Sequence, residues 1–171
     1  RRVLFRSLRP SPLSSDTEFL RRVSLDLTGT LPTPETIKEF LADKTLNKRA
    51  KRIEALLDSP DYALYWTLKW NDLLRNSRAT LQYKGMWSLW NWIHASMREN
   101  RPYDQFVREI LTAQGGAYSV SPANYFRTAT TPQDLTETTA QLFLGVRLQC
   151  AKCHRSEEHT SELQSHHDLV C

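Results

Sequence analysis

Apolar residues recur along this chain at every third or fourth position, the spacing that places them on one face of a helix. Phe19, Leu20, Val23 and Leu27 follow it near the start, and comparable sets occur downstream. The chain has only five glycines, and no segment shows the strict alternation of a strand. The sequence therefore predicts an all-α fold, a single domain of about seven helices.

Capping residues set the expected helix starts. Ser15 and Glu18 have the spacing of a capping box, and Pro34 follows Thr33, where a first-turn proline loses no needed donor. Helices are expected to begin near these residues: Ser15, Thr33, Asn47, Ser59, Met86, Asp104 and Thr131. The interpretation divides the chain at short turns, so the helices pack as neighbours.

Two segments are expected to be irregular. Residues 76–85 are polar and predict a loop. Residues 115–131 are rich in small residues and form the longest predicted loop, where we expect any ligand contact. The last helix, starting at Thr131, should run through Val146 and lead towards Cys150.

The tryptophans invite an aromatic-site interpretation, but large aromatic residues at helical spacing normally supply packing area. The five residues are Trp66, Trp70, Trp87, Trp90 and Trp92. We expect most of them to lie in the core.

Both ends of the chain resemble translated sequencing adapter. Residues 1–7 match one strand of such an adapter, and residues 155–171 match the other strand followed by an index. We interpret these segments as artefacts and residues 8–154 as one all-α, cytochrome-type domain that is truncated at its C-terminal end. The histidines then fall to His94 and His154, and the cysteines to Cys150 and Cys153.

Charge and hydropathy narrow the partners. The formal net charge of +4 is spread along the helices and gives only a slight indication of an acidic partner. No block of like charge or nucleic-acid motif occurs, so we predict no nucleic-acid partner. No apolar run is long enough to predict a membrane span.

The feature with a definite chemistry is Cys150-Ala151-Lys152-Cys153-His154. At this spacing two thiols can add to the two vinyl groups of haem while the adjacent imidazole becomes an axial iron ligand. The sequence therefore predicts covalent haem c, with thioethers at Cys150 and Cys153 and with His154 as the metal ligand.

Other uses of the same residues stay open. A thioredoxin-like redox pair belongs in a βαβ context that this sequence lacks. A Zn site finds three ligands here and needs a fourth, from His94 or from elsewhere. A structural disulfide or free thiols are further alternatives.

The second axial ligand is not assigned by the sequence. His94, Met86 and Met97 are candidates, although core packing is the more usual role of such residues. A hydrolase interpretation ranks third, because Ser119 and Ser121 have no base nearby in the sequence. No catalytic residue is predicted, and whether the chain is an enzyme stays open.

Residues 16–23, 25–34, 99–107 and 139–154 resemble the planctomycete cytochrome-type domain known as the domain of unknown function numbered 1549. The resemblance implies a part of a large exported or periplasmic bacterial protein, with other domains as partners, often a cytochrome c domain before it. The family's pattern continues beyond its Cys-x-x-Cys-His, where this chain departs from it at Arg155. The resemblance implies no established reaction.

Overall fold

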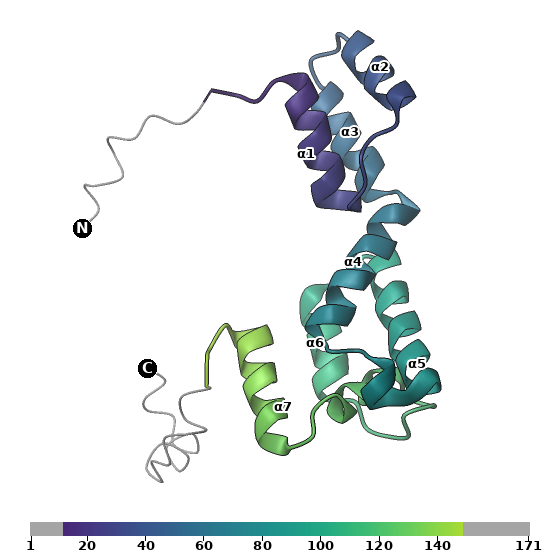
Figure 1. The fold of residues 1–171 in the computed structure, drawn as a ribbon, viewed down its shortest axis with the longest axis vertical. Coiled ribbons are helices and arrows are strands. Elements are labelled where there is room, and N and C mark those ends of the chain that lie inside the picture. The colour runs from purple at the N-terminus through teal and green to yellow at the C-terminus, as the bar shows by residue number, and fades with distance from the viewer. Residues whose placement is uncertain (1–11, 149–171) are drawn as a thin grey trace, which may run out of the picture. The chain divides into compact units, whose positions relative to one another are not determined.

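Residues 12–148 are described by a computed structural model, and within that range the secondary structure is helical and contains no strand (Figure 1). The all-α prediction and the expected number of about seven helices are confirmed. The elements in chain order are α1 (Asp16–Thr28), α2 (Pro34–Ala42), α3 (Lys48–Leu57), α4 (Pro60–Leu73), α5 (Arg78–Arg98), α6 (Tyr103–Leu111), the 3-10 helix η1 (Ser121–Arg127), α7 (Pro132–Thr139) and the π-helical η2 (Ala140–Leu144).

The chain forms two compact units, one ending at Trp66 and the other beginning at Thr67. The division falls inside α4. The end segments interpreted as adapter, 1–7 and 155–171, lie outside the described residues.

Helix starts follow the capping chemistry expected from the sequence. The Ser15 hydroxyl accepts a hydrogen bond from the Glu18 amide at 3.3 Å, and Thr33 accepts one from the Thr36 amide at 3.3 Å. The box at Ser15 is only half formed, because the Glu18 carboxylate pairs with Arg22 instead. The expected cap at Asp104 is wrong: α6 begins at Tyr103, and Asp104 lies in its first turn.

In the first unit α1, α2 and α3 enclose a small apolar core (Figure 1). Leu20, Phe40 and Leu56 are buried in it, and the rings of Phe19 and Phe40 stack at 5.9 Å. Burial of side chains of this size is the main stabilising term of a small helical unit.

Asp16 ties the start of α1 to the start of α3. Its carboxylate oxygens lie 2.6 Å from Lys48 Nζ and 2.7 Å from an Arg49 guanidinium nitrogen. The same two cations lie over the rings of Phe40 and Phe19. Charge and aromatic packing therefore hold the same helix pair together.

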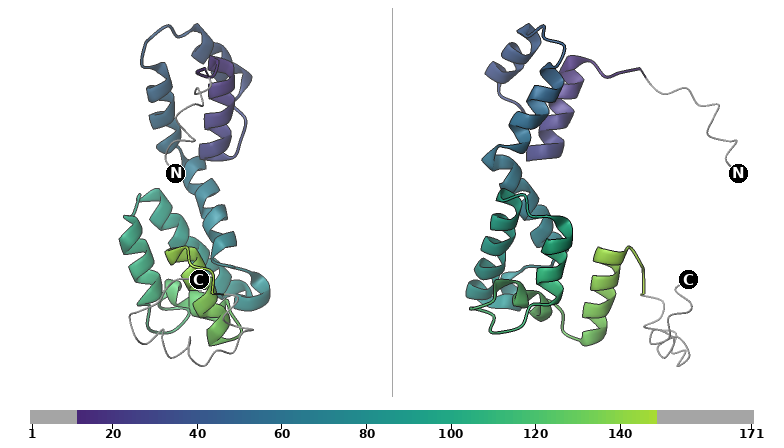
Figure 2. Two further views of the ribbon diagram at one scale, coloured as in Figure 1. Left: turned by 90° about the vertical axis from the view of Figure 1, so that its left-hand side faces the viewer. Right: turned by 180° about the vertical axis from the view of Figure 1, so that it is seen from behind.

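The second unit is built around α5, which runs antiparallel to α6 (Figure 2). Its core cluster consists of Leu74, Leu81, Leu89, Ile93, Phe106, Ile110 and Tyr125. The Trp92 ring stacks on Phe106 at 4.9 Å, and its Nε1 donates to Glu109 at 3.2 Å. These contacts fix α6 against α5.

The predicted loop at residues 76–85 is wrong for most of its length. Ser77 caps a helical turn by accepting from the Thr80 amide at 3.4 Å, and Leu81 in that turn is fully buried. Gln82 then interrupts the helix, with φ 60 and ψ 176, before α5 continues. The polar composition reflects the exposed side of this turn, whereas its single leucine fixes it in the core.

The predicted loop at residues 115–131 also needs correction, because it contains η1. Asn124 and Tyr125 of η1 are fully buried, and η1 packs against α5. The approach is close at Gly85, where a Cβ atom would lie 2.9 Å from Asn124 Oδ1 and 3.0 Å from an Arg127 guanidinium nitrogen. Glycine is therefore needed at residue 85 for backbone proximity.

We predict that Asp16→Asn destabilises the first unit at neutral pH. Hydrogen bonds from Lys48, and next from Arg49, hold the pKa of the Asp16 carboxyl below its ordinary value of 3.8. A lowered pKa contributes stability above 3.8 that is lost as pH falls through the folded value. The melting temperature of the variant, followed by circular dichroism, should be lower at neutral pH and converge with that of the parent chain well below pH 3.8.

The matched control is Asp26→Asn, which alters an exposed carboxylate on the same helix. It forms no ion pair among residues 12–148, so its effect should be small at every pH. Equal losses in the two variants would contradict the assigned role of Asp16.

We predict that Gly85→Ala destabilises the second unit by about 1–2 kcal/mol. Overpacking costs about 1–3 kcal/mol, and alanine's better helix propensity offsets only about 1 kcal/mol of that. Asn124 cannot yield easily, because its amide donates to the carbonyls of Ala117 and Ser121 at 2.6 and 3.0 Å. Urea unfolding measures the loss. Gly116→Ala, which meets only Ser119 Oγ at 3.2 Å, should be nearly neutral; a stabilised Gly85→Ala variant would refute the close-packing account.

Candidate functional site

The three residues of the predicted haem motif, Cys150, Cys153 and His154, lie outside the described residues. The structure does describe the chain that leads to them, from the start of α7 to Leu148. The geometry of the site is therefore developed from this approach and from the other candidate residues.

The approach begins at a well-formed helix start. The Thr131 hydroxyl accepts from the Asp134 amide at 3.1 Å and donates to the Asp134 carboxylate at 2.7 Å. Pro132 occupies the first turn, as the sequence predicts. Hydrogen bonding within this turn therefore fixes the entry into α7 without help from residues farther along the chain.

The last helix ends earlier than expected. The prediction that it continues through Val146 is wrong, because Gly145 adopts φ 70 and closes η2 at Leu144. The amides of Gly145 and Val146 both point to the Ala140 carbonyl, the latter at 3.2 Å. A left-handed glycine is the ordinary way to end a helix, and it frees the next residues from the helical path.

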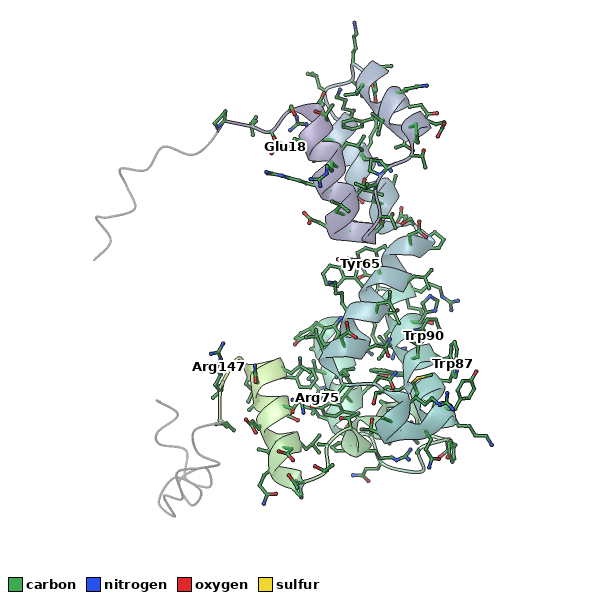
Figure 3. The ribbon with its side chains drawn as sticks, in the orientation of Figure 1. Glu18, Tyr65, Arg75, Trp87, Trp90 and Arg147 are labelled. Carbon is green, nitrogen blue, oxygen red and sulfur yellow. The ribbon has the colours of Figure 1, made fainter. Side chains whose placement is uncertain are left out.

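The end of this helix is anchored from one side. Leu135, Leu142 and Phe143 pack against the core cluster of the second unit. The rings of Phe143 and Tyr125 meet at 6.2 Å. The side chain of Leu144 is 72% exposed, and Arg147 is also exposed (Figure 3). The anchored η2 thus gives way to an exposed segment just before the motif.

Tyr125 supplies the polar part of this anchor. Its hydroxyl is hydrogen-bonded to that of Thr139 at 2.9 Å, although the residue is fully buried. Burial, opposed by that hydrogen bond, raises the pKa of the Tyr125 hydroxyl above its ordinary value of 10.0. Tyr125 therefore stays neutral and links η1 to α7 throughout the physiological range.

Two of the candidate second axial ligands have packing roles. Met86 and Met97 lie against the core cluster of the second unit. His94 is half-buried, and its ring stacks on that of Trp90 at 5.0 Å with an interplanar angle of 9°. Core packing accounts for both methionines, and ring stacking accounts for His94.

The tryptophans separate into two groups, so the expectation that most lie in the core holds only in part. Trp70 and Trp92 pack against the core cluster of the second unit, whereas Trp87 is 40% exposed. Successive ring contacts connect Tyr83 to Trp87 at 6.2 Å, Trp87 to Trp90 at 5.2 Å and Trp90 to His94. We call Tyr83, Trp87, Trp90 and His94 the aromatic row of α5.

The sequence reasoning missed this row because Tyr83 fell inside the predicted loop. The four residues are spaced by four, three and four positions, which places them on one side of a helix. That spacing is the signal that could have found the row.

The expected ligand loop does not offer a hydrolytic site. Ser121 Oγ accepts from Ser88 Oγ at 2.9 Å, and Ser119 Oγ donates to the Gly116 carbonyl at 3.1 Å. Within residues 12–148 neither serine is hydrogen-bonded to a histidine or a carboxylate. Both hydroxyls serve local structure, and the ligand contact expected at 115–131 gains no support from these bonds.

The part of the chain that the structure describes contains no group of three or more His, Cys, Asp or Glu side chains placed to hold a metal ion. Among the same residues, no helix is both long and apolar enough to cross a membrane. Neither observation bears on the motif itself, which lies beyond Leu148.

Comparison with known proteins gives one match. A family model described as "Protein of unknown function (DUF1549)" matches residues 2–169, a range that includes the whole motif. No curated protein and no solved structure matches the chain.

We predict that Tyr125→Phe destabilises the second unit by about 0.5–1.5 kcal/mol, the usual net contribution of one hydrogen bond. The variant keeps the ring packing against Phe143 and loses only the bond to Thr139. Urea unfolding of the two proteins gives the difference. Tyr118→Phe, at a tyrosine that is 65% exposed, serves as the control and should change the midpoint little. An unchanged midpoint for Tyr125→Phe would show that the buried hydroxyl does not stabilise this anchor.

Proposed function

The chain belongs to the family described as Protein of unknown function (DUF1549), and from that premise we propose that it is a c-type haem-binding, electron-transfer type module. We place it in a larger exported bacterial protein of planctomycete type. The observation that carries the proposal is the run Cys150-Ala151-Lys152-Cys153-His154 inside the matched range.

The donor set fits haem c. Cys150 and Cys153 would supply the two thioether sulfurs, and the imidazole of His154 would be an axial ligand to the iron. When bound, the haem iron would supply one-electron redox chemistry, while the protein positions and shields it. No other reaction is assigned to the chain.

The approach to the motif supports a defined attachment point. Leu142 and Phe143 hold η2 on the core of the second unit, and Gly145 ends the helix a few residues before Cys150. A prosthetic group carried on the following segment would therefore be tethered near a fixed helix end. The exposed Arg147 adds a positive charge to this segment, which suits a haem propionate or an acidic partner.

The context of the module follows from the same chemistry. Covalent attachment of haem to cysteine thiols is performed outside the bacterial cytoplasm, so the proposal places the protein in the periplasm or beyond. Its partners would be other domains of the parent protein, with donors or acceptors such as a cytochrome c domain among them. Zn binding at the same three donors is the rival, and it requires a fourth ligand from elsewhere.

We predict covalent haem in the full-length gene product, expressed with an export leader in a host that matures c-type cytochromes. A denaturing gel stained for haem peroxidase activity should show a band, and the spectrum of the native protein should contain a Soret band. Cys150→Ala combined with Cys153→Ala removes both thioether sulfurs and should reduce the stain to background.

Lys152→Ala provides the matched control, because Lys152 lies between the cysteines and supplies no donor to the iron. Its product should stain like the parent protein. A folded parent protein that contains stoichiometric Zn and no haem would replace the haem proposal with the structural metal site.

A further inference from the structure

α5 presents chemically opposite faces along its length. Its buried residues are Leu81, Gly85, Leu89, Ile93 and Ser96. At 100° per residue, the aromatic row of α5 lies roughly opposite this buried face. Large rings on the side of a helix that faces away from its core are unusual, because packing cannot account for their position.

The exposure of the row agrees with this placement. Tyr83 is 61% exposed and Trp87 is 40% exposed, while Trp90 and His94 are half-buried. In Figure 3 Trp87 and Trp90 stand on the side of α5 away from α6. Eleven residues of helix separate the ends of the row, so it extends over about 16 Å.

The charge on α5 is of one sign. This 21-residue helix contains Arg78, Lys84 and Arg98 and has no aspartate or glutamate. Arg78 and Lys84 are exposed and form no ion pair with any residue from 12 to 148. Arg98 has only a long contact of 3.8 Å with Glu99. Lys84 adjoins Tyr83 in sequence and lies one turn before Trp87, so cationic and aromatic groups share one surface.

The ring geometry distinguishes between anionic partners. Tyr83 meets Trp87 at 68°, and Trp87 meets Trp90 at 72°. One face of Trp90 is covered by His94. Stacking of nucleobases needs free, separate ring faces, which these edge-to-face contacts do not favour. Tilted amphipathic rings beside lysine and arginine are instead typical of side chains at a lipid headgroup interface.

We infer that the aromatic row of α5, together with Arg78 and Lys84, is a docking surface for an anionic lipid membrane. The rings enter the headgroup region, and the basic side chains bind lipid phosphates. This is peripheral binding on the membrane surface. It does not depend on haem, since the residues of the surface and of the motif are different.

The test uses the 171-residue chain and vesicles of phosphatidylcholine, with or without phosphatidylglycerol. We expect sedimentation with the anionic vesicles, weaker binding in high salt, and a blue shift of tryptophan fluorescence on binding. Lys84→Glu should lower the partition coefficient about tenfold or more, since each basic residue at an anionic leaflet contributes about 1 kcal/mol. Tyr83→Ser combined with Trp87→Ser should lower it by about tenfold.

Two controls separate this surface from the general basicity of the chain. Arg108→Glu makes the same change in net charge at an exposed residue of α6, which packs on the opposite side of α5 through Trp92 and Phe106. Tyr118→Ser removes a tyrosine that is 65% exposed outside α5. Both controls should bind vesicles within about threefold of the parent chain, as expected where no contact with the leaflet is lost.

Cys150→Ala with Cys153→Ala should bind the same vesicles, so failure of the haem proposal leaves this result unaffected. Absence of binding to the anionic vesicles would overturn the inference. So would equal losses for Lys84→Glu and Arg108→Glu, which would mean that net charge alone drives adsorption. Binding of a single-stranded oligonucleotide or an acidic peptide without vesicle binding would assign α5 to another partner and also overturn it.

Discussion

The second unit depends on the close approach of η1 to the buried face of α5 at Gly85. Because residue 85 has no side chain, Asn124 can lie against the helix and still donate to two carbonyls of its own segment. That placement leaves Tyr125 fully buried and in reach of Thr139. The position of α7, and with it the chain that precedes the haem motif, therefore rests on a contact made far away in sequence.

This dependence explains which parts of the fold were predictable from sequence. Helix starts at Ser15, Thr33, Ser59 and Thr131 rest on a hydroxyl that caps the following turn, so local chemistry is sufficient. The segments at 76–85 and 115–131 are composed of polar or small residues, which locally favour loops. They become helical because Leu81 and Tyr125 are buried by distant elements, and such tertiary contacts leave no periodic signal.

The candidate site was predictable to a different extent. The donors of a Cys-x-x-Cys-His run adjoin one another in sequence, so their chemistry is legible without a fold. A second axial ligand comes from a remote part of the chain, and residue type alone cannot select it. The packing of Met86 and Met97 against the core shows why: a methionine that fills a core and one that ligates iron look alike in sequence.

The two faces of α5 also bear on how a redox module of this kind would work. Membrane docking confines a protein to two dimensions and fixes which side meets partners, so it raises the encounter rate without new protein contacts. The buried face of α5 holds η1 and, through Tyr125, the approach to Cys150. The exposed face is left free to carry the aromatic row. A single helix can thus serve both roles because its 3.6-residue repeat keeps residues such as Gly85 and Trp87 on different sides.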